Sequence, residues 1–271
     1  MSPPGSVLIT GCSDGGVGSG LALVFQARGY HVFATTRSPE KMSTLKDLPN
    51  VTLLQLDVVD PSQIRAAVEA VTATTGGTLS VLINNAARFH LRPLLDDDLE
   101  AAKQTFETNV WGPLAVTKAF APLLIQARGM LVNITTIAGH NPMPYSGVYG
   151  ASKRAQEHMS DVFRLELAPF DVKVLSVVTG AVASGQGAQS VVLPSDSRYK
   201  AIEPIIAARG SNSHSRMPVV TYTTQVVDQI EAGTTGKVWL GNHAEEAKQA
   251  TLNPEKAAEW VCLVCPGRGW C

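Results

Sequence analysis

Seven short apolar runs recur along the chain, and each is almost continuously hydrophobic rather than alternating between apolar and polar residues. Strands buried on both faces have this pattern, because helices cover both sides of a parallel sheet. Segments long enough for crossover helices separate the runs. We therefore predict an α/β fold: a single domain with a doubly wound, seven-stranded parallel sheet and helices on both faces. The runs are VLIT (7–10), HVFATT (31–36), VTLLQL (51–56), LSVLIN (79–84), GMLVNIT (129–135), VKVLSVV (172–178) and KVWLG (237–241).

One region interrupts this alternation. Residues 184–217 are rich in serine, glycine and other polar residues, and they follow the sixth apolar run. A long insert beyond the carboxyl end of a parallel strand is where a lid over a substrate would lie, although a loose surface loop would read the same way. We predict one domain over residues 5–244, which includes a substrate lid at 184–217, and a C-terminal tail at 245–271.

Composition and charge narrow the functional classes. Of the 271 residues, 45% are hydrophobic and 17% are charged, and the formal net charge is −1. Such a chain has no positive field for nucleic acid or anionic lipid, and it has no basic cluster with interleaved aromatic residues, so we expect no nucleic-acid partner. No run approaches the ~20 apolar residues of a membrane span, and the first residues lack the pattern of a signal peptide.

The cysteines indicate a reducing, cytoplasmic compartment. Three of the four, Cys262, Cys265 and Cys271, crowd the last ten residues and cannot staple the whole fold. The motif CLVC at 262–265 supplies at most half of a metal site, and only Cys271 and the distant His243 remain as further ligands, so we expect no metal.

A glycine-rich stretch, TGCSDGGVGSG (10–20), follows the first apolar run and precedes a plausible helix. Glycines let a backbone approach a pyrophosphate, and a helix N-terminus offers free N–H groups and the positive end of its dipole. Such a stretch is typical of the phosphate-binding turn of Rossmann-type folds. A tight turn that only packs a helix on a strand would also use glycine, so the stretch alone leaves both interpretations open.

The segment after the second run indicates which dinucleotide would bind. A site for NAD usually carries a carboxylate there, on the ribose hydroxyls. Here the run ends in threonines, and Arg37 follows. A guanidinium grips a 2′-phosphate in a bidentate way, so Arg37 favours NADPH over NADH, unless it is an ordinary solvated loop residue. Asp57, just after the third run, either accepts a hydrogen bond from adenine or caps a turn.

The strongest chemical signal is YGASK (149–153) at the start of a helix expected over 148–168. Tyr149 and Lys153 are four residues apart and share one face of this helix. A nearby ammonium lowers the pKa of a phenol, and a tyrosine tuned in this way can give a proton to a carbonyl oxygen as hydride reaches the carbon. Thr136, at the end of the fifth run, is placed to steady the developing oxyanion. The helix carries its apolar residues on one stripe, formed by Ala155, Met159, Val162 and Phe163.

Together these motifs resemble the short-chain dehydrogenase/reductase family, in its single-domain branch, from residue 6 to about 244. TGCSDGGVG resembles the glycine loop of the family. The remaining matches are LDV (56–58) to its adenine-side motif, NNAA (84–87) to NNAG, TNVWG (108–112), NITTIAG (133–139) and YGASK to its catalytic motifs, and TGAVAS (179–184) to PG-x-V-x-T. Within the family the chain looks most like the fungal NADPH-dependent 1-acyldihydroxyacetone-phosphate reductases and their relatives.

The resemblance implies a catalytic tetrad of Asn109, Thr136, Tyr149 and Lys153. Tyr149 is the implied general acid, and Lys153 lowers its pKa and holds the nicotinamide ribose. Thr136 orients the substrate carbonyl, and Asn109 holds a water that relays protons to Lys153. The implied cofactor-binding residues are Gly11, Ser13, Gly16, Val17, Gly18, Arg37, Asp57, Val58, Asn85, Ala86, Lys118, Tyr149, Lys153, Val182 and Ser184.

The glycine loop holds one residue more than the family spacing. Four residues rather than three separate Gly11 from Gly16, so we take the stretch as the pyrophosphate turn with one residue inserted in CSDG. Val17 and Gly18 then open the helix under the phosphates. Asp14 is expected to point to solvent, because a carboxylate that faced a phosphate would repel it.

The expected function is NADPH-dependent reduction of a ketone in a lipid-like or secondary-metabolite substrate. The alternative is a redox-neutral or scaffold-type tailoring enzyme, a cyclase or isomerase, on the same fold. Phe89, His90, Met143 and Tyr145 are candidates for the wall of the substrate pocket. The long helices expected over 101–127 and 148–168 resemble the oligomer faces of the family, so we expect a homodimer or homotetramer. The tail departs from the apolar ending of the subgroup and gives no support to attachment to the endoplasmic reticulum or lipid droplets.

Overall fold

The computed structural model describes residues 5–184, 191–211 and 216–253. All seven predicted apolar runs form strands of one parallel sheet, with the order β3-β2-β1-β4-β5-β6-β7. The predicted fold class is therefore confirmed. The strands are β1 (Ser6–Thr10), β2 (His31–Thr36), β3 (Val51–Gln55), β4 (Val81–Asn84), β5 (Met130–Thr136), β6 (Lys173–Thr179) and β7 (Gly236–Leu240).

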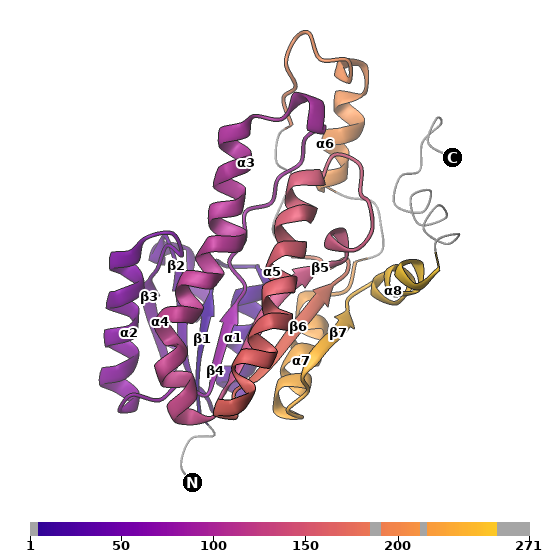
Figure 1. Cartoon of the computed structure of the whole chain (residues 1–271). Helices are drawn as coiled ribbons and strands as arrows, with labels where there is room; N and C mark the ends of the chain where they lie inside the picture. Colours follow the sequence, from indigo (N-terminus) through magenta and orange to yellow (C-terminus); the bar gives the residue numbers. More distant parts are fainter. Residues whose placement is uncertain (1–4, 185–190, 212–215, 254–271) are drawn as a thin grey trace.

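Helices cover both faces of the sheet (Figure 1). The helices α1 and α7 pack on one face, and α2, α4 and α5 pack on the other. The helix bounds are α1 (Val17–Ala27), α2 (Pro61–Thr75), α3 (Leu99–Phe106), α4 (Gly112–Ala127), α5 (Gly147–Glu166), α6 (Glu203–Ser211), α7 (Val219–Glu231) and α8 (Ala244–Leu252). A π-helix over Glu107–Trp111 joins α3 to α4.

Two apolar cores lie on opposite sides of the sheet, because successive strand residues point to opposite faces. Val7 and Ile9 of β1 join the core under α1 and α7, whereas Leu8 joins the core under α2 and α4. The continuous apolar character of each strand is thus explained by burial on both sides, which fixes the sheet and the position of its carboxyl edge.

The helix α5 differs from the apolar stripe expected for it. Its buried positions are mostly polar and include Ser152, Lys153, Gln156, Glu157 and Ser160. Of the four residues of the apolar stripe, three are only partly buried, and Val162 is exposed. The helix is therefore amphipathic in an unusual sense: its polar residues face the protein, and part of its apolar stripe faces outward.

The predicted lid is described in part, over 191–211 and 216–217. Leu193 and Ile206 pack on Leu91 in a small separate apolar cluster, to which Tyr145 and Phe89 also contribute. In Figure 1, α3 and α6 rise together beyond the carboxyl edge of the sheet. This placement agrees with a lid, while the boundaries of the lid and of the domain remain predictions. Of the tail, α8 is described, and the three tail cysteines lie outside the described residues.

By length and composition alone, the continuous helical run Leu99–Ala127 could cross a membrane. It is weak evidence, since a core helix of a folded domain passes the same test. Val116, Phe120 and Leu124 of this run are buried against the sheet.

Candidate active site

The carboxyl edge of the sheet brings the predicted residues to one end of the fold. Ligands bind at this edge in open parallel sheets because the loops after the strands meet there. The glycine loop follows β1, Arg37 follows β2, the Asn85 segment follows β4, and Thr136 ends β5. The segment with Val182 follows β6.

The glycine loop leads directly into α1. Gly16 is the N-cap and α1 begins at Val17, as predicted; no side chain caps the helix and its first turn holds no acid. The first N–H groups of α1 therefore lack a side-chain acceptor. A Cβ atom on Gly18 would lie 2.3 Å from the carbonyl oxygen of Gly11, so only glycine permits this approach of helix and strand.

Asp14, within the stretch CSDG that holds the extra residue, is anchored to the protein surface. The Asp14 carboxylate is exposed, but it does not simply point to solvent as predicted. It accepts hydrogen bonds from the backbone N–H and the hydroxyl of both Ser43 and Thr44, at 2.6–3.0 Å. These bonds, led by the Thr44 hydroxyl, lower the pKa of Asp14 to about 2. Gly15 follows in the left-handed region, with φ +72°. Asp14 thus ties the glycine loop to the β2–β3 connection.

On the side of β2 and β3, the predicted residues occupy different environments. The Ser13 hydroxyl lies 3.1 Å from the Thr36 hydroxyl. Arg37, the residue after Thr36, has an exposed side chain. Asp57 accepts a hydrogen bond from the Val59 backbone N–H, so the turn-capping interpretation is realised in the structure.

Two residues of the predicted cofactor-binding set occupy contrasting environments, and their contacts with a cofactor stay predictions. The Val58 side chain is buried in the apolar core, where a Cβ atom on Gly112 would lie 2.6 Å from its Cγ2 atom. Because the Val58 side chain packs in this core, only the main chain of Val58 is available to contact a cofactor. Lys118 is exposed on α4 next to the buried Val116 and Thr117. No contact in the described chain joins it to the other predicted site residues.

The segment after β4 is fastened to β1. The Asn85 side chain donates to the carbonyl oxygens of Thr10 and Gly11, at 2.8 and 3.0 Å. The backbone N–H of Ala86 donates to the Thr10 hydroxyl. After β6, Val182 is buried and Ser184 is partly buried. The Asn85 amide nitrogen therefore has a structural task, which the sequence did not reveal.

A chain of contacts through Ser152 connects two members of the predicted tetrad, Asn109 and Tyr149. The Asn109 side chain donates to the Ser152 hydroxyl at 2.9 Å, and this hydroxyl donates to the Tyr149 carbonyl oxygen at 2.7 Å. Asn109 lies in the π-helix, and such one-turn irregularities are frequent at functional sites. Its side chain also pairs with the backbone of Arg88 in both directions, at 2.7 and 3.0 Å.

Lys153 is tied to β5 and to its own helix. Its ammonium donates to the Ile134 carbonyl oxygen at 2.9 Å and to the Gln156 side-chain oxygen at 3.0 Å. Burial lowers its pKa to about 7. The Ile134 carbonyl lies two residues before Thr136, whose hydroxyl accepts a 3.3 Å hydrogen bond from the Ala138 N–H. Lys153 and the turn after Thr136 are thus held by the same strand.

The expectation that Lys153 lowers the pKa of Tyr149 is not met here. Burial raises the pKa of Tyr149 to about 12. The lysine ammonium is directed to Ile134 and Gln156, and its own charge is disfavoured by burial. The tyrosine is therefore a protonated phenol over the whole neutral range. Phe89 packs edge-on against its ring, with centroids 5.0 Å apart, as one of the predicted wall residues.

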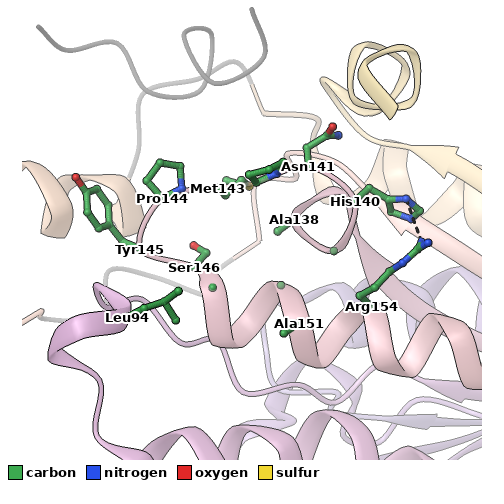
Figure 2. A pocket seen from close by; sticks show the side chains of 14 residues that line it. Leu94, Ala138, His140, Asn141, Met143, Pro144, Tyr145, Ser146, Ala151 and Arg154 are labelled. Atoms are coloured by element: carbon green, nitrogen blue, oxygen red, sulfur yellow. Dashed lines mark hydrogen bonds between the residues drawn. The ribbon is translucent and has the colours of Figure 1, made fainter. Parts of the chain in front are cut away.

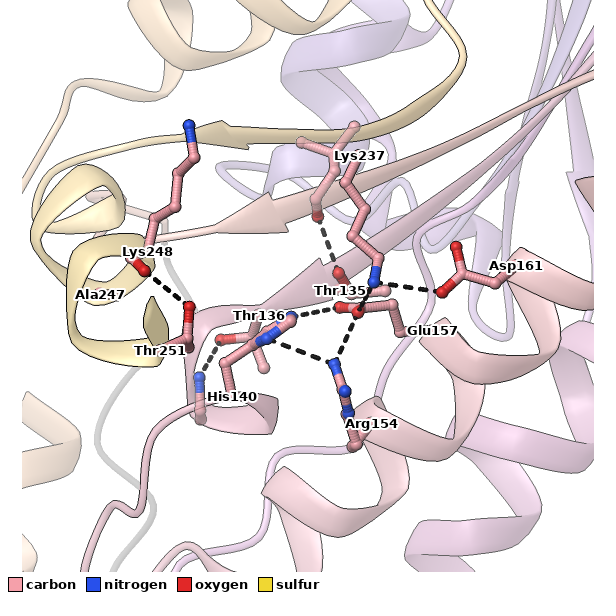
Figure 3. Close-up of polar contacts among 12 residues, drawn as sticks. Thr135, Thr136, His140, Arg154, Glu157, Asp161, Lys237, Ala247, Lys248 and Thr251 are labelled. Carbon is pink, nitrogen blue, oxygen red and sulfur yellow. Dashed lines mark hydrogen bonds and ion pairs between the residues drawn. The ribbon is translucent and has the colours of Figure 1, made fainter. Parts of the chain in front are cut away.

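Sequence reasoning missed a charged cluster on the neighbouring side of α5 (Figure 3). The Glu157 carboxylate is 1% exposed and is 2.6 Å from His140, 2.9 Å from Arg154 and 2.8 Å from Lys237. Its pKa is raised by burial, but the hydrogen bonds from His140 and Lys237 outweigh this and hold it below its ordinary value. The cluster joins α5 to the turn after Thr136 and to β7. In the sequence, the only local signal of this cluster is that Glu157 follows the basic residues Lys153 and Arg154 by four and three positions.

A cavity of about 510 Å³ lies beside this cluster, between the 138–147 segment and α5 (Figure 2). On α5 it is lined by Gly147, Gly150, Ala151 and Arg154, which share the face opposite to Tyr149 and Lys153. Met143 and Tyr145 line this cavity and Phe89 and His90 do not. His90 instead lies 2.6 Å from Asp97. The four predicted wall residues therefore do not all line this cavity, although Phe89 and Tyr145 pack in the same apolar cluster.

Similarity to known proteins agrees with this architecture. The family of short chain dehydrogenases matches residues 6–191. The short-chain dehydrogenase PC-15 of Penicillium crustosum is 48% identical over 244 residues, which cover 89% of this chain and 90% of that protein. The NADPH-dependent 1-acyldihydroxyacetone phosphate reductase of Schizosaccharomyces pombe is 40% identical over 176 residues, which cover 65% of this chain and 59% of that protein.

A solved structure extends the similarity to three dimensions. The crystal structure of a short chain dehydrogenase from Burkholderia cenocepacia in complex with NADP has a TM-score of 0.75 and 26% identity, and the match covers 94% of this chain and 96% of that one. These matches agree with the sheet order, the glycine loop and the motif that holds Tyr149 and Lys153. The chain belongs to the short-chain dehydrogenase/reductase family.

Proposed function

We propose that this protein is an NADPH-dependent carbonyl reductase with Tyr149 as the general acid. The observation that carries the proposal is the pair of Tyr149 and Lys153 at the carboxyl edge of the sheet, where Lys153 is buried and Tyr149 is partly buried on the same face of α5. A buried ammonium is costly to maintain, so its presence beside a partly buried phenol at the ligand-binding edge favours a chemical role over a purely structural one.

The residues around α1 fit a dinucleotide. The N-terminus of α1 has neither a side-chain cap nor an acid, and Gly15 and Gly16 precede it without a bulky side chain. Such a terminus attracts a pyrophosphate. Gly16, Val17 and Gly18 would hold the pyrophosphate, Ser13 and Arg37 the 2′-phosphate side, and Asn85 and Lys153 the riboses. Bound NADPH supplies the hydride.

In the proposed reaction, the protein supplies a proton and orients the substrate carbonyl. The Tyr149 hydroxyl gives its proton to the substrate carbonyl oxygen as that oxygen gains negative charge, and the alcohol is the product. The Thr136 hydroxyl donates a hydrogen bond to the same oxygen and orients it. Because burial keeps the pKa of Tyr149 at about 12, the phenol is present as an acid at neutral pH, which suits reduction rather than oxidation.

The proposed proton relay needs one adjustment. Both amide hydrogens of Asn109 are used by Arg88 and Ser152, and its oxygen already accepts from Arg88. A water that passes protons to Lys153 would therefore be held by the Asn109 main chain in the π-helix rather than by its amide nitrogen.

We expect that replacing Arg37 with Ala weakens NADPH binding about 10- to 100-fold, because one charge-assisted hydrogen-bond pair to a phosphate is lost. NADH carries no 2′-phosphate, so its binding should change less than twofold. Fluorescence titration of the reduced nicotinamide measures both constants. The matched control is Lys46→Ala, an exposed cation on the same β2–β3 connection. An equal loss for both cofactors would contradict the assignment of Arg37.

Replacing Asp14 with Ala should free the glycine loop from the β2–β3 connection. We expect a loss of about 0.5–1 kcal/mol in the free energy of unfolding, a small value because the group is exposed. Since the pKa of Asp14 is lowered to about 2, this contribution is complete above its ordinary value of 3.8 and disappears as the pH falls toward 2. Denaturant unfolding at pH 6 and pH 2.5 measures it. A variant that differs as much at pH 2.5 as at pH 6 would argue against this origin.

The direct test of the proposal is loss of absorbance at the reduced-nicotinamide band when purified protein, NADPH and a panel of ketones are mixed. The panel should include medium-sized lipid-like and polyketide-like ketones. Turnover with NADPH that exceeds turnover with NADH supports the proposal. Tight NADPH binding without consumption on any ketone, together with conversion of a substrate to an isomer, would favour the alternative of a redox-neutral tailoring enzyme.

We also infer a homodimer or homotetramer, in a cytoplasmic setting. Large apolar side chains are exposed along α5, the π-helix and the segment after α5: Trp111, Val162, Leu165 and Phe170. Exposed apolar residues that cluster on helices favour contact with a second copy.

A further inference from the structure

We propose that Gln156 is a positioning residue for Lys153, which holds the ammonium in place and favours its charged form from within the core. This inference rests on the proposed function, because it matters for turnover only if Lys153 takes part in the reaction. No motif identified in the sequence included Gln156.

The first observation is the contact itself. The Gln156 side-chain oxygen lies 3.0 Å from the Lys153 Nζ atom, and both side chains are 2% exposed. An ammonium has three donors and no acceptor, so a buried lysine needs oxygen atoms around it. The Ile134 carbonyl and Gln156 provide two of them within the described part of the chain. Gln156 is thus one of two groups that replace the water lost on burial.

The second observation is that contacts on the side away from Lys153 fix the orientation of the Gln156 amide. Its nitrogen donates to the Asn133 side-chain oxygen at 3.4 Å, and this oxygen also accepts from the Asn84 amide at 2.9 Å. The Asn133 nitrogen donates in turn to the Ser160 hydroxyl at 2.8 Å. Because the Asn133 oxygen can only accept, the amide of Gln156 must present nitrogen to Asn133 and oxygen to Lys153.

This buried polar chain explains why α5 faces the sheet with polar residues. The amide of Asn84 also donates to Thr117 of α4 at 3.0 Å, so the chain of hydrogen bonds extends from Lys153 through two strands to α4, which lies on the same face of the sheet as α5. The donors in this chain of hydrogen bonds are oriented so that the Gln156 oxygen faces the Lys153 ammonium. A neutral lysine amine could accept a hydrogen bond instead, so the polarity of the whole chain favours the charged lysine.

Other ionisable groups do not take over this task. On α5, the Glu157 carboxylate is directed to His140, Arg154 and Lys237, and Tyr149 is protonated. On α7, the Tyr222 hydroxyl is paired with Thr179 of β6 at 2.6 Å. No carboxylate in the described residues is paired with Lys153, and burial dominates the shift of its pKa. The Gln156 oxygen is therefore the side-chain group that opposes this shift.

The test is the titration of Lys153 in the full, cofactor-free protein. Lysine labelled with 13C at Cε reports protonation by NMR, and Lys153→Arg assigns the signal. We expect that Gln156→Met lowers the midpoint of Lys153 by about one pH unit, and that the isosteric Gln156→Glu raises it. Ser160→Ala, one turn further along the same chain, should leave the midpoint within about 0.2 units.

If neither Gln156 variant moves the midpoint while both stay folded by circular dichroism, the inference is overturned. Gln156→Glu keeps the shape of the side chain, so at least one variant should fold. With NADPH and a ketone, the alkaline limb of the kcat profile should move in the same order as the midpoints. Failure of the proposed function would look different: Lys153→Met would retain turnover, whereas the NMR midpoints would still depend on residue 156.

Discussion

Replacing Tyr149 with Phe should lower kcat for ketone reduction by a factor of about 100 to 10,000 and leave NADPH binding nearly unchanged. The loss has this size because a positioned general acid contributes that much to rate. Phenylalanine keeps the ring that packs edge-on against Phe89, so the wall of the site persists. Only the acidic proton is removed. Steady-state absorbance at the reduced-nicotinamide band gives kcat, and fluorescence titration gives the NADPH dissociation constant.

The matched control is Tyr30→Phe. Tyr30 also packs edge-on against a phenylalanine, Phe25, at 5.0 Å, but it lies between α1 and β2 at the amino end of the sheet. Its kcat should stay within about twofold of the wild-type value. If Tyr149→Phe turned over as fast as Tyr30→Phe, Tyr149 would not be the acid, and the proton would have to come from another group.

Replacing Glu157 with Gln should produce the largest loss of stability among the substitutions considered. Removing one partner of a buried ion pair costs about 3–5 kcal/mol, and we expect the lower end, about 3 kcal/mol, because Arg154 and Lys237 retain access to water. For a protein of this size that corresponds to a fall of about 6–12 °C in Tm. His140 is the partner left buried, at 8% side-chain exposure.

The pH dependence of this loss follows from the lowered pKa of Glu157. The stabilisation is present above the ordinary value of 4.5 and is lost as the pH falls through the lower value in the folded protein. The wild type and Glu157→Gln should therefore differ at pH 7 and converge in acid. Differential scanning calorimetry at several pH values measures this. Glu245→Gln is the control, since the Glu245–Lys248 pair is exposed on α8 and should contribute under about 0.5 kcal/mol. Equal effects of both substitutions would rule out a special role of the cluster.

The strands and the site edge could be predicted because they depend on local signals. Each strand is an uninterrupted apolar run such as HVFATT, and burial on both faces demands this. The glycine loop, Tyr149 and Lys153 are likewise short motifs, and parallel strands necessarily bring their carboxyl ends together. The sequence alone therefore predicts that the glycine loop, Arg37 and Thr136 meet at one edge of the sheet, with Lys153 on the helix that follows.

The polar interior of α5 could not be predicted, because it depends on partners far away in the sequence. Gln156 is buried through Asn133 and Asn84, and Glu157 through His140 and Lys237. Helical periodicity favoured the apolar stripe that includes Val162, yet that side is partly exposed. Similarly, the extra residue in CSDG could be found by counting residues, but the attachment of Asp14 to Ser43 and Thr44 depends on the position of the β2–β3 connection.

The assumed effect of Lys153 on Tyr149 failed for a related reason. Spacing places the two side chains on one face, but burial affects the pKa of both, in opposite directions. A pairwise rule therefore gave the wrong sign for the tyrosine. The proposed role of Tyr149 as an acid is compatible with this, since a protonated phenol is the form that reduction requires.

The most direct test of the proposed function is the fate of the hydride itself. NADPH that carries deuterium at the transferable position of its nicotinamide should be incubated with the wild-type protein and the best ketone of the panel, and the product should be examined by mass spectrometry and NMR. We predict an alcohol with one deuterium on the former carbonyl carbon, formed in equal amount to the NADP produced. A product without deuterium, formed while NADPH remains unconsumed, would contradict the proposed function as a reductase and favour a redox-neutral enzyme.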